Sequence, residues 1–470
     1  MRKKLLTIFT AAFMALCLLP SAGLLLGYEG ENYENRPLAP MPELVERSGL
    51  NLDFPAAFDN YYQDHFGFRE EMVTAFHTAA LVLEDTLNED VIIGQNDMLY
   101  YSETLSDYLG TDLLSDRDIR RAARILRIQQ DYVQARGADF AFAAAPNKNT
   151  VYPEYMPKRL RPTGAFSNRE RLAAALMDMG VNQIFLDFEL TARKGEGMLY
   201  HYHDTHWNQQ GAMIGYNAIM AKVFPDADYN TYEDVSPEIK TGWAGDLHYF
   251  LFPASEGNME YPDYGLSLEY DTDPRAPGRT VTIGTTSSAN DKRLLLYRDS
   301  FGDGLMPYLS ANLGRVLYDA EFPYNYASMA AEDPDAVVIE LVERNIPNLL
   351  LKAPAMPAPL TQCRGQLTGA LSAAMTSFEQ NGSTLICGLF DAFSYDPATC
   401  RILLKSGDVC YEAFPITHER AASLSCPGDT LEGFTLTLPG EYGGEGTFAL
   451  LIEGQDGYVQ SEVFSLDIAK

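Results

Sequence analysis

A cluster of ionisable side chains lies near the middle of the chain, where three histidines and one aspartate occur within residues 201–206 (HYHDTH). Imidazoles and a carboxylate at this density often bind zinc or iron. The remaining histidines form no second cluster of the kind that a dinuclear site requires. A metal site is therefore the minor alternative, and we expect neither a metal nor another cofactor.

Asp204 and His206 allow a second interpretation of the cluster. Two residues apart in a turn that leads into a helix, a carboxylate can orient an imidazole and stabilise its protonated form. Asp204 and His206 then form the orienter and the general base of a serine triad, whose nucleophile must come from another turn. His201 and His203 have no role in such a triad, and we expect them to pack or to face substrate.

Ser300 is the candidate nucleophile. The apolar run 293–297 (RLLLY) has the length of a buried strand, and residues 298–302 (RDSFG) interrupt it before an apparent helix. A serine at such a junction is exposed at the carboxyl edge of a sheet, where backbone N–H groups at the start of a helix can stabilise an oxyanion. The alternative is that Asp299 and Ser300 only cap the helix. The Asp204–His206 pair favours the triad.

Five further residues are expected to contact substrate or the oxyanion: Arg298, Phe301, Lys148, Asn149 and Trp207. Lys148 and Asn149 follow a predicted strand, at whose carboxyl end ligands bind, and a solvated loop is an equal alternative. Trp207 and Trp243 have rings that can stack on sugars, and a place in the core is the alternative. Arg344 is expected to pair with a nearby carboxylate.

The elements that must position these residues alternate between strands and helices. We predict strands over residues 139–145, 183–186, 293–297 and 336–341, and helices over 54–87, 116–136, 169–179 and 208–224. Short apolar strands separated by helices are typical of a parallel α/β sheet. Beyond about residue 357, a helix is predicted over 367–381, and short strand-like runs between Gly, Pro, Asp and Ser indicate a small β-sandwich.

The motifs as a set resemble a known family. Residues 204–208 (DTHWN) and 298–301 (RDSF) are similar to the SGNH-hydrolase-like proteins of polysaccharide O-acetylation, among them the alginate O-acetylation proteins. They resemble especially the bacterial DHHW family, which has a Lys-Asp-Ser-Phe-type nucleophile segment. Further similar segments are 64–69 (DHFGFR), 146–154 (PNKNTVYPE), 245–247 (GDL) and 340–344 (ELVER). The resemblance covers roughly residues 30–355 and leaves out the C-terminal module.

The resemblance implies a three-layer, flavodoxin-like (SGNH hydrolase-like) domain with Ser300 as nucleophile, His206 as base and Asp204 as orienter. The Asp–His pair precedes the serine, which is a circular permutation of ordinary SGNH esterases. Arg298 departs from the Gly-Asp-Ser pattern of those esterases, and its bulk can alter the oxyanion geometry.

The implied activity is O-acetyl transfer to a cell-envelope or exported polysaccharide through an acyl-serine. The implied partner is a membrane-bound acyltransferase that supplies the acetyl groups. A carbohydrate acetylesterase of the same fold is one alternative. A non-catalytic glycan-binding surface protein is the other.

The N-terminus predicts export. Residues 1–27 carry three basic residues at positions 2–4 and continue as an apolar run long enough to span a bilayer. An uncleaved anchor with the body outside the membrane keeps these charges in the cytoplasm, whereas cleavage near residues 21–23 (SAG) releases a secreted protein. We expect a stalk over 28–53, the SGNH-like catalytic domain over 54–357 and the helix with the β-sandwich module over 358–470.

Charge and cysteine content narrow the range of partners and compartments. The formal net charge of −30 argues against nucleic acid as a partner, because polyphosphate is repelled. Five of the six cysteines lie in the last quarter of the chain, where one or two disulfides and small buried side chains are equal alternatives.

Overall fold

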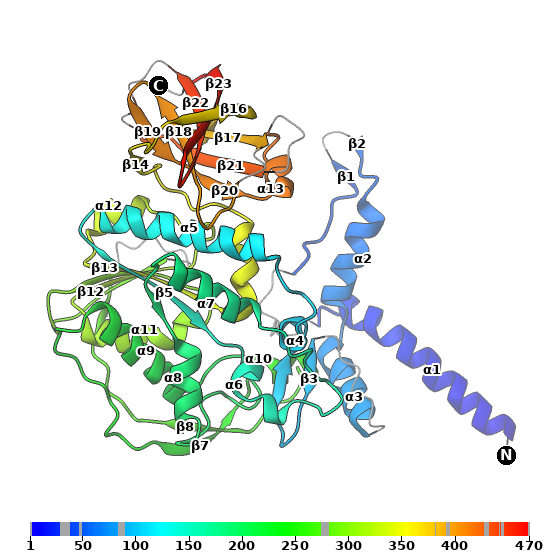
Figure 1. Ribbon diagram of the computed structural model, residues 1–470. Helices are drawn as coiled ribbons and strands as arrows, with labels where there is room; N and C mark the ends of the chain where they lie inside the picture. The colour runs from blue at the N-terminus through cyan, green and yellow to red at the C-terminus, as the bar shows by residue number, and fades with distance from the viewer. Residues whose placement is uncertain are drawn as a thin grey trace.

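The structure is a computed structural model that describes residues 2–28, 38–46, 49–82, 90–273, 282–380, 382–391, 395–426, 432–440, 442 and 446–468. Figure 1 shows an N-terminal helical segment, an α/β domain and an all-β module that lies against helix α5 of that domain. The chain order of these parts agrees with the organisation expected from the sequence. The boundaries proposed for them stay predictions.

A seven-stranded sheet with the order β6-β5-β13-β11-β12-β10-β9 forms the centre of the α/β domain. Its strands are β5 (Asp139–Ala145), β6 (Gln183–Ile184), β9 (Asp271–Thr272), β10 (Thr282–Thr286), β11 (Arg293–Tyr297), β12 (Arg315–Asp319) and β13 (Ala336–Val342). The five strands from β6 to β12 are parallel, and β10 and β9 extend the sheet in antiparallel pairs. The fold is therefore α/β with a mainly parallel sheet, as predicted.

The strand order identifies the permutation. If counting starts at β11, the parallel strands β11, β12, β13, β5 and β6 have the flavodoxin-like order 2-1-3-4-5. The chain therefore runs through the last two strands of that order before the first three. The point at which the strand order reverses lies between β11 and β13, and ligands of open α/β sheets bind at the carboxyl ends of the strands there.

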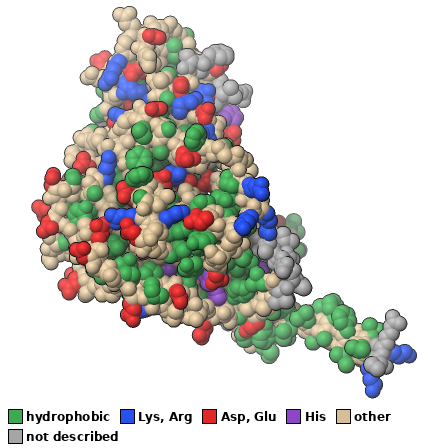
Figure 2. All heavy atoms as spheres, turned by 60° about the horizontal axis from the view of Figure 1, so that its bottom comes forward, with side chains coloured by type: hydrophobic (Ala, Val, Ile, Leu, Met, Phe, Trp, Pro, Cys, Tyr) green, Lys and Arg blue, Asp and Glu red, His purple; other side chains and the backbone are tan. Residues whose placement is uncertain are grey.

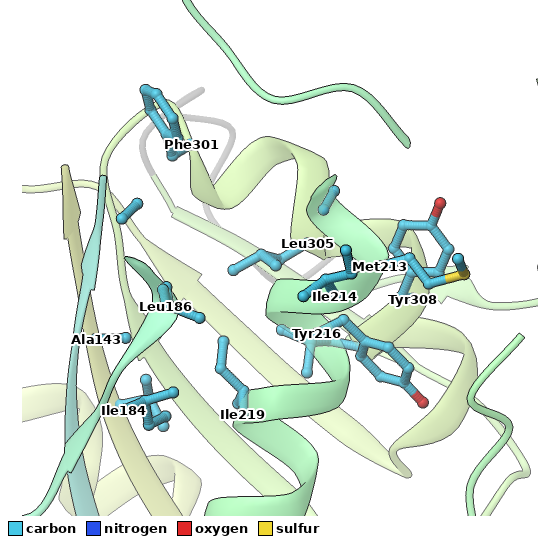
Figure 3. Packing of buried hydrophobic residues seen from close by; sticks show 14 of the residues in the cluster. Ala143, Ile184, Leu186, Met213, Ile214, Tyr216, Ile219, Phe301, Leu305 and Tyr308 are labelled. Carbon is cyan, nitrogen blue, oxygen red and sulfur yellow. The ribbon is translucent and has the colours of Figure 1, made fainter. Parts of the chain in front are cut away.

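Helices cover both faces of the sheet, because successive side chains of each strand point to opposite sides. On β11, Leu296 belongs to one buried cluster and Leu295 to the other. The helices on the first face are α8 (Leu186–Arg193), α9 (Gln209–Val223) and α11 (Gly302–Asn312), and those on the second are α5 (Asp116–Gln134), α7 (Asn168–Asp178) and α12 (Ala327–Glu332). Figure 3 shows the first cluster, in which Ala143 and Ile184 of the sheet meet Ile219 of α9.

Two mainly antiparallel sheets form the C-terminal module. Their strands are β14 (Leu360–Thr361), β15 (Leu367–Ala370), β18 (Arg401–Ser406), β19 (Val409–Glu412), β22 (Thr447–Gly454) and β23 (Gly457–Ser465) in one sheet, and β16 (Ser372–Gln380), β17 (Ser383–Asp391), β20 (Phe414–Ile416) and β21 (Glu432–Thr437) in the other. The two sheets enclose an apolar core, and β15 pairs with β23 in parallel. The disulfide Cys387–Cys426 links β17 to the chain after the short helix α13 (His418–Ser423).

The helix predicted over 367–381 is wrong, because β15 and β16 occupy this segment. Leu371, Ala373 and Met375 occupy every second position and pack toward the core; Leu371 and Met375 are buried, and Ala373 is partly buried. A two-residue spacing of this kind is the period of a strand. All nine residues of β16 pair with β17. Cross-strand pairing and burial have outweighed the alanine-rich composition that suggested a helix.

Two helices, α2 (Phe54–His65) and α3 (Arg69–Val82), stand where one helix was predicted over 54–87, whose last residues lie outside the described part. The residues between them turn the chain, and Phe68 has a φ of 61°. The predicted stalk lies partly outside the described residues, and its described part includes the small hairpin of β1 (Val45–Glu46) and β2 (Gly49–Leu50). The helix α1 (Arg2–Leu25) precedes it and is long and apolar enough to cross a membrane.

Candidate active site

Ser300, His206 and Asp204 meet at the carboxyl edge of the sheet. Ser300 lies three residues after β11, and its exposed Oγ is 2.9 Å from Nε2 of His206. Nδ1 of the same ring is 2.8 Å from Oδ1 of the buried Asp204. The ring therefore lies between the hydroxyl and the carboxylate, in the order that proton transfer from a serine requires.

The turn that bears Asp204 and His206 lies between α8 and α9. Tyr200 and Trp207 form an isolated β-bridge at its base, and Asn208 caps α9 by accepting hydrogen bonds from the N–H groups of Gln210 and Gly211. Within this turn, His206 donates its backbone N–H to Oδ1 of Asp204, which also faces the ring. The two-residue spacing thus lets one carboxylate fix both the backbone and the ring of the same residue.

The carboxylates around His206 stabilise its protonated form. Burial alone lowers the pKa of His206, but the hydrogen bond and charge of Asp204, together with the charge of Asp246, outweigh burial and raise the pKa above its usual value. Burial opposes ionisation of Asp204, but the hydrogen bond and charge of His206 hold the pKa of that carboxyl below its usual range. An imidazole held in this way readily accepts the proton of a serine hydroxyl.

Asp246 is a second carboxylate at the site, and its role was missed from the sequence. It begins α10 (Asp246–Leu251), donates its backbone N–H to Oδ2 of Asp204 at 3.0 Å and accepts from the N–H and hydroxyl of Thr205 at 2.8 and 2.6 Å. Its Oδ2 is 3.8 Å from Nδ1 of His206. A Cβ at Gly245 would lie 2.3 Å from the carbonyl oxygen of His203, so only glycine allows this approach.

Asp299 fixes the turn that bears the serine. Its Oδ1 accepts from the N–H of Phe301 at 3.0 Å, and its Oδ2 accepts from the N–H of Val342 at 2.7 Å and from the side-chain amide of Asn345 at 3.0 Å. The carboxylate therefore joins the end of β11 to the end of β13. Asp299 accepts from a backbone N–H of this turn, as the helix-capping alternative predicts in part. The Ser300 hydroxyl, in contrast, faces His206.

Phe301 and Trp207 are buried, and their contacts connect the serine turn to the turn that bears Asp204 and His206. The indole Nε1 of Trp207 donates to the carbonyl oxygen of Phe301 at 3.1 Å, and the two ring centroids are 5.2 Å apart. The Phe301 ring also lies 5.0 Å from the ring of His206. Both residues were expected to contact substrate. Phe301 is fully buried beneath the reacting groups, whereas Trp207, although buried, is among the residues that line a cavity beside this turn.

Arg298 is also buried and is directed at the first turn of α11. Its Nη1 donates to the carbonyl oxygen of Asp299 at 3.1 Å and lies 2.8 Å from Oδ1 of Asp303. A Cβ at Gly302 would lie 2.6 Å from the Arg298 side chain, so the following glycine makes room for this arginine. The guanidinium expected near the oxyanion is thus paired within the protein.

Lys148 and Asn149 hold the scaffold behind the site. The buried amine of Lys148 donates to the carbonyl oxygens of Leu99, His201 and Tyr202 at 2.6, 2.8 and 3.1 Å, and burial lowers its pKa to about 7. The amide of Asn149 donates to the hydroxyl of Thr104 at 2.8 Å. Lys148 therefore positions the turn of the histidines, and Asn149 holds the segment that bears Thr104; both side chains are buried.

A metal site at these residues has little support from the geometry. Within the described residues, the histidine and acidic groups close enough to share an ion are Asp204, His206 and Asp246. Each carboxylate oxygen of this trio already accepts a hydrogen bond within the protein. His203 instead pairs with Asp97 at 2.9 Å. The donor set thus fits a hydrogen-bonded cluster better than a metal centre.

Together, the permuted flavodoxin-like sheet and the serine after its first strand define an SGNH hydrolase-like domain. Residues 91–290 match the family described as the SGNH hydrolase-like domain of acetyltransferase AlgX. The matched range includes Asp204 and His206 and ends ten residues before Ser300.

Two curated relatives are distant. A probable alginate O-acetylase AlgJ from Pseudomonas syringae pv. tomato is 23% identical over 213 residues, which is 44% of this chain and 53% of that protein. A probable alginate O-acetylase AlgJ from Pseudomonas putida is 22% identical over 324 residues, or 63% of this chain and 81% of that protein. The chain thus spans about half the length of the first of these relatives.

Solved structures with a similar chain path include the O-acetyltransferase domain of Pseudomonas putida AlgJ, with a TM-score of 0.39, 18% identity and coverage of 55% of this chain and 92% of that one. A DHHW family protein from Eubacterium siraeum has a TM-score of 0.40 and 14% identity, and the match covers 55% of this chain and 94% of that one.

Proposed function

We propose that this protein is an extracytoplasmic O-acetyltransferase that transfers acetyl groups to a cell-envelope or exported polysaccharide through an acyl-serine at Ser300. The hydrogen-bonded series from Ser300 through His206 to Asp204 is the observation that supports this function most directly. The family match of residues 91–290 supports acetyl transfer, and the names of the distant relatives support a polysaccharide acceptor.

Acetyl transfer at this site takes two displacements. In the first, His206 Nε2 takes the Ser300 proton while Oγ bonds to the acetyl carbon of the donor, and the C=O π electrons move onto the carbonyl oxygen. The tetrahedral intermediate collapses, the donor oxygen leaves, and His206 returns the proton to it. In the second, His206 takes the proton of an acceptor hydroxyl while its oxygen bonds to the acetyl carbon; the bond to Oγ then breaks, and His206 returns the proton to Oγ, which regenerates Ser300.

A cavity of about 540 Å³ beside the turn of the histidines is the candidate acceptor site. His201, Gln209, Asp263 and Tyr308 are among its lining residues. Burial lowers the pKa of His201 to about 4, so the ring is neutral and can exchange hydrogen bonds with hydroxyl groups.

Trp243 is the candidate sugar platform next to this cavity. Its side chain is 40% exposed, and its ring lies edge-on to the ring of His201 with 4.5 Å between centroids. An exposed indole can stack on the apolar face of a pyranose. Trp207, the other tryptophan expected to do so, is only 3% exposed.

The N-terminal segment supports a retained anchor. Figure 2 shows α1 as an apolar rod that extends from the body with basic side chains at its far end, where Lys3 and Lys4 lie. Its other end packs on the body, since the N–H of Gly67 donates to the carbonyl oxygen of Pro20 at 3.0 Å. A Cβ at Gly67 would lie 2.3 Å from Cα of Gly23. Cleavage near residues 21–23 would remove these contacts.

The disulfide of the C-terminal module also supports a location of the protein body outside the cytoplasm. The disulfide Cys387–Cys426 is of the kind that persists outside the cytoplasm. A site on that side of the membrane lacks cytoplasmic acetyl donors, so a membrane-bound acyltransferase that passes acetyl groups across the bilayer is the partner we propose.

Hydrolysis of a chromogenic acetyl ester by the full-length protein in detergent, with Ser300→Ala as the paired variant, tests the function. We expect hydrolysis that Ser300→Ala abolishes, and acetylated product when an oligosaccharide acceptor is added. Hydrolysis without any transfer would identify an acetylesterase. Equal rates in both proteins, or none in either, would leave a glycan-binding role.

A further inference from the structure

Arg344 lacks an acidic partner at the edge of the candidate site. It lies two residues after β13, and β13 and β11 are the strands between which the strand order reverses. The expected carboxylate is not found among the residues that the structure describes. Its guanidinium Cζ instead lies 5.6 Å from the ring centroid of Phe301 and 5.6 Å from that of Tyr101. A half-buried cation without a counter-ion is unusual in a chain with a net charge of −30.

Arg344 also lies close to the reacting groups. The N–H of Val342 donates to Asp299, the residue before Ser300, so the chain that leads to Arg344 is attached to the serine turn. Its positive charge acts on His206, where it opposes the carboxylates and lowers the pKa of the ring. The charged and titratable groups that act on this imidazole are thus Asp204, Asp246 and Arg344, with His201 nearby.

The serine turn itself offers few donors to an oxyanion. The N–H of Phe301 donates to Oδ1 of Asp299, and the N–H of Gly302 donates to the carbonyl oxygen of Asp299 at 3.2 Å. In the described part of the chain, only the N–H of Ser300 in this turn has no acceptor within the protein. A single N–H is fewer than the two or more donors by which acyl-transfer sites usually hold an oxyanion.

The neighbouring amides and cations do not supply the missing donor. The amide groups of Asn345 and Asn149 donate to Asp299 and Thr104. Arg298 is paired with Asp303, and Lys148 with three carbonyl oxygens. Among the described residues, Nε of Arg298 also lacks an acceptor, but that side chain is buried and directed at the first turn of α11. Arg344 is therefore the cationic side chain beside the serine turn for which no hydrogen-bond or ion-pair partner is found within the described residues.

We propose that Arg344 is a catalytic residue whose guanidinium donates a hydrogen bond to the oxyanion of the tetrahedral intermediate, beside the N–H of Ser300. As Ser300 Oγ bonds to the acetyl carbon and its proton passes to His206, the carbonyl oxygen gains the π electron pair and a negative charge. The guanidinium stabilises this charge, and the carbonyl re-forms when the donor oxygen leaves with the proton from His206. This role rests on the proposed function of Ser300 as the nucleophile.

The test compares the full-length wild type with Arg344→Met and Arg344→Lys, because methionine keeps the apolar stem and lysine keeps the charge without the planar donors. For a neutral chromogenic acetyl ester we expect Arg344→Met to lower kcat by roughly 10²–10³-fold with KM changed little. Arg344→Lys should recover part of this loss, and added guanidinium ion should partly rescue Arg344→Met. Arg136→Met is the matched control, since Arg136 also lies over an aromatic ring, that of Tyr132, outside the site.

The rate at which a fluorophosphonate labels Ser300 gives a second readout that does not depend on turnover of an ester. We expect slower labelling of Arg344→Met at unchanged thermal stability. A kcat and a labelling rate within threefold of wild type would overturn the role of Arg344 while leaving the serine chemistry intact. A raised KM confined to an acidic polysaccharide acceptor would also overturn it, in favour of a carboxylate-binding role. Absence of labelling in the wild type would refute the proposed function itself.

Discussion

The two oxygens of Asp204 serve different neighbours, since Oδ1 accepts from the ring and backbone of His206 and Oδ2 accepts from the backbone of Asp246. Because the carboxylates of Asp204 and Asp246 raise the pKa of His206, the ring is protonated up to a higher pH than a free histidine. A protonated ring cannot accept the serine proton. Ester hydrolysis by the wild type should therefore rise with pH through a midpoint above about 6.5.

Asp204→Asn should change both the height and the position of this pH profile. The ring loses its orienting carboxylate, and we expect kcat to fall by roughly 10³–10⁴-fold. Without the charge of Asp204 to oppose it, burial lowers the pKa of His206. The remaining activity should therefore rise at a lower pH than in the wild type. Measurement of kcat/KM from pH 5 to 9 tests both effects.

Asp97→Asn is the control for this experiment, because Asp97 is a solvent-exposed carboxylate that pairs with His203 instead of His206. It should leave the rate and the midpoint unchanged. A midpoint in Asp204→Asn that stays where it is in the wild type, or moves to higher pH, would contradict the electrostatic account of His206.

Single residues also show how far the sequence alone could predict the site. Asp204, His206 and Ser300 stand in short local patterns, a two-residue spacing and a strand-to-helix junction, so their proximity could be anticipated. Asp246 lies 40 residues from His206, and although the segment 245–247 was noted as similar to the family, no local pattern tied it to the histidine; only the fold brings it to the ring. The roles of Lys148 and Trp207 were also hidden, because the sequence does not show which side of a turn becomes buried.

At the scale of elements, β13 carries an ionisable group into the core. Glu340 is fully buried behind the serine turn, and its Oε2 accepts from the N–H of Asp299 at 3.4 Å. Burial, and then the charge of Asp299, raise the pKa of Glu340 well above its ordinary value. The folded protein therefore keeps a proton that the unfolded chain loses once the pH exceeds the usual pKa of a glutamate, about 4.3.

Glu340→Gln should remove the cost of keeping that proton. In the wild type, this residue destabilises the folded state by up to about 1.4 kcal/mol for each pH unit above the unfolded pKa, until the folded pKa is reached. Glutamine is neutral and keeps the acceptor for the Asp299 N–H, so the variant should gain stability relative to wild type between pH 5 and pH 8. Urea unfolding at both pH values measures the difference.

Glu379→Gln, at the exposed end of β16, is the matched control and should show the same change between the two pH values as the wild type. A wild type and Glu340→Gln with parallel pH dependence would mean that Glu340 is ionised in the folded protein. Activity should persist in Glu340→Gln, because the bonds from Asp299 to Phe301 and Val342 do not involve Glu340.

Elements differed in how well the sequence predicted them. The strands β5, β11 and β13 are buried on both faces and appear as continuous apolar runs, so their type and place were predicted. The strand β10, which lies between β12 and β9, is largely polar (TIGTT), and no apolar run marked it. The order of the strands depends on long-range pairing, and the resemblance to a permuted family was its only signal.

At the scale of the whole molecule, arginines of α5 attach the C-terminal module to the α/β domain. Arg121 and Glu432 form a buried pair with 2.6 Å between Nη2 and Oε2 and side-chain exposures of 8% and 7%. Arg124 donates to the carbonyl oxygens of Pro397 and Ala398 at 2.9 and 3.0 Å. These bonds join residues about 300 positions apart, so no local pattern could have indicated them.

Glu432→Ala should weaken the contact between the module and α5 more than removal of an exposed ion pair at the edge of that contact. The change leaves the Arg121 guanidinium buried with Asp118 as its only remaining carboxylate among the described residues, and loss of one member of a buried pair typically costs about 3–5 kcal/mol. We expect calorimetry to show the module unfolding at a lower temperature and separately from the α/β domain.

Arg120→Ala is the control, because Arg120 and Asp396 cross the same interface 3.0 Å apart with exposures of 37% and 42%. An exposed pair is worth about 1 kcal/mol or less. Equal small effects of both changes would mean that apolar packing, and not the buried ion pair, holds the module on α5.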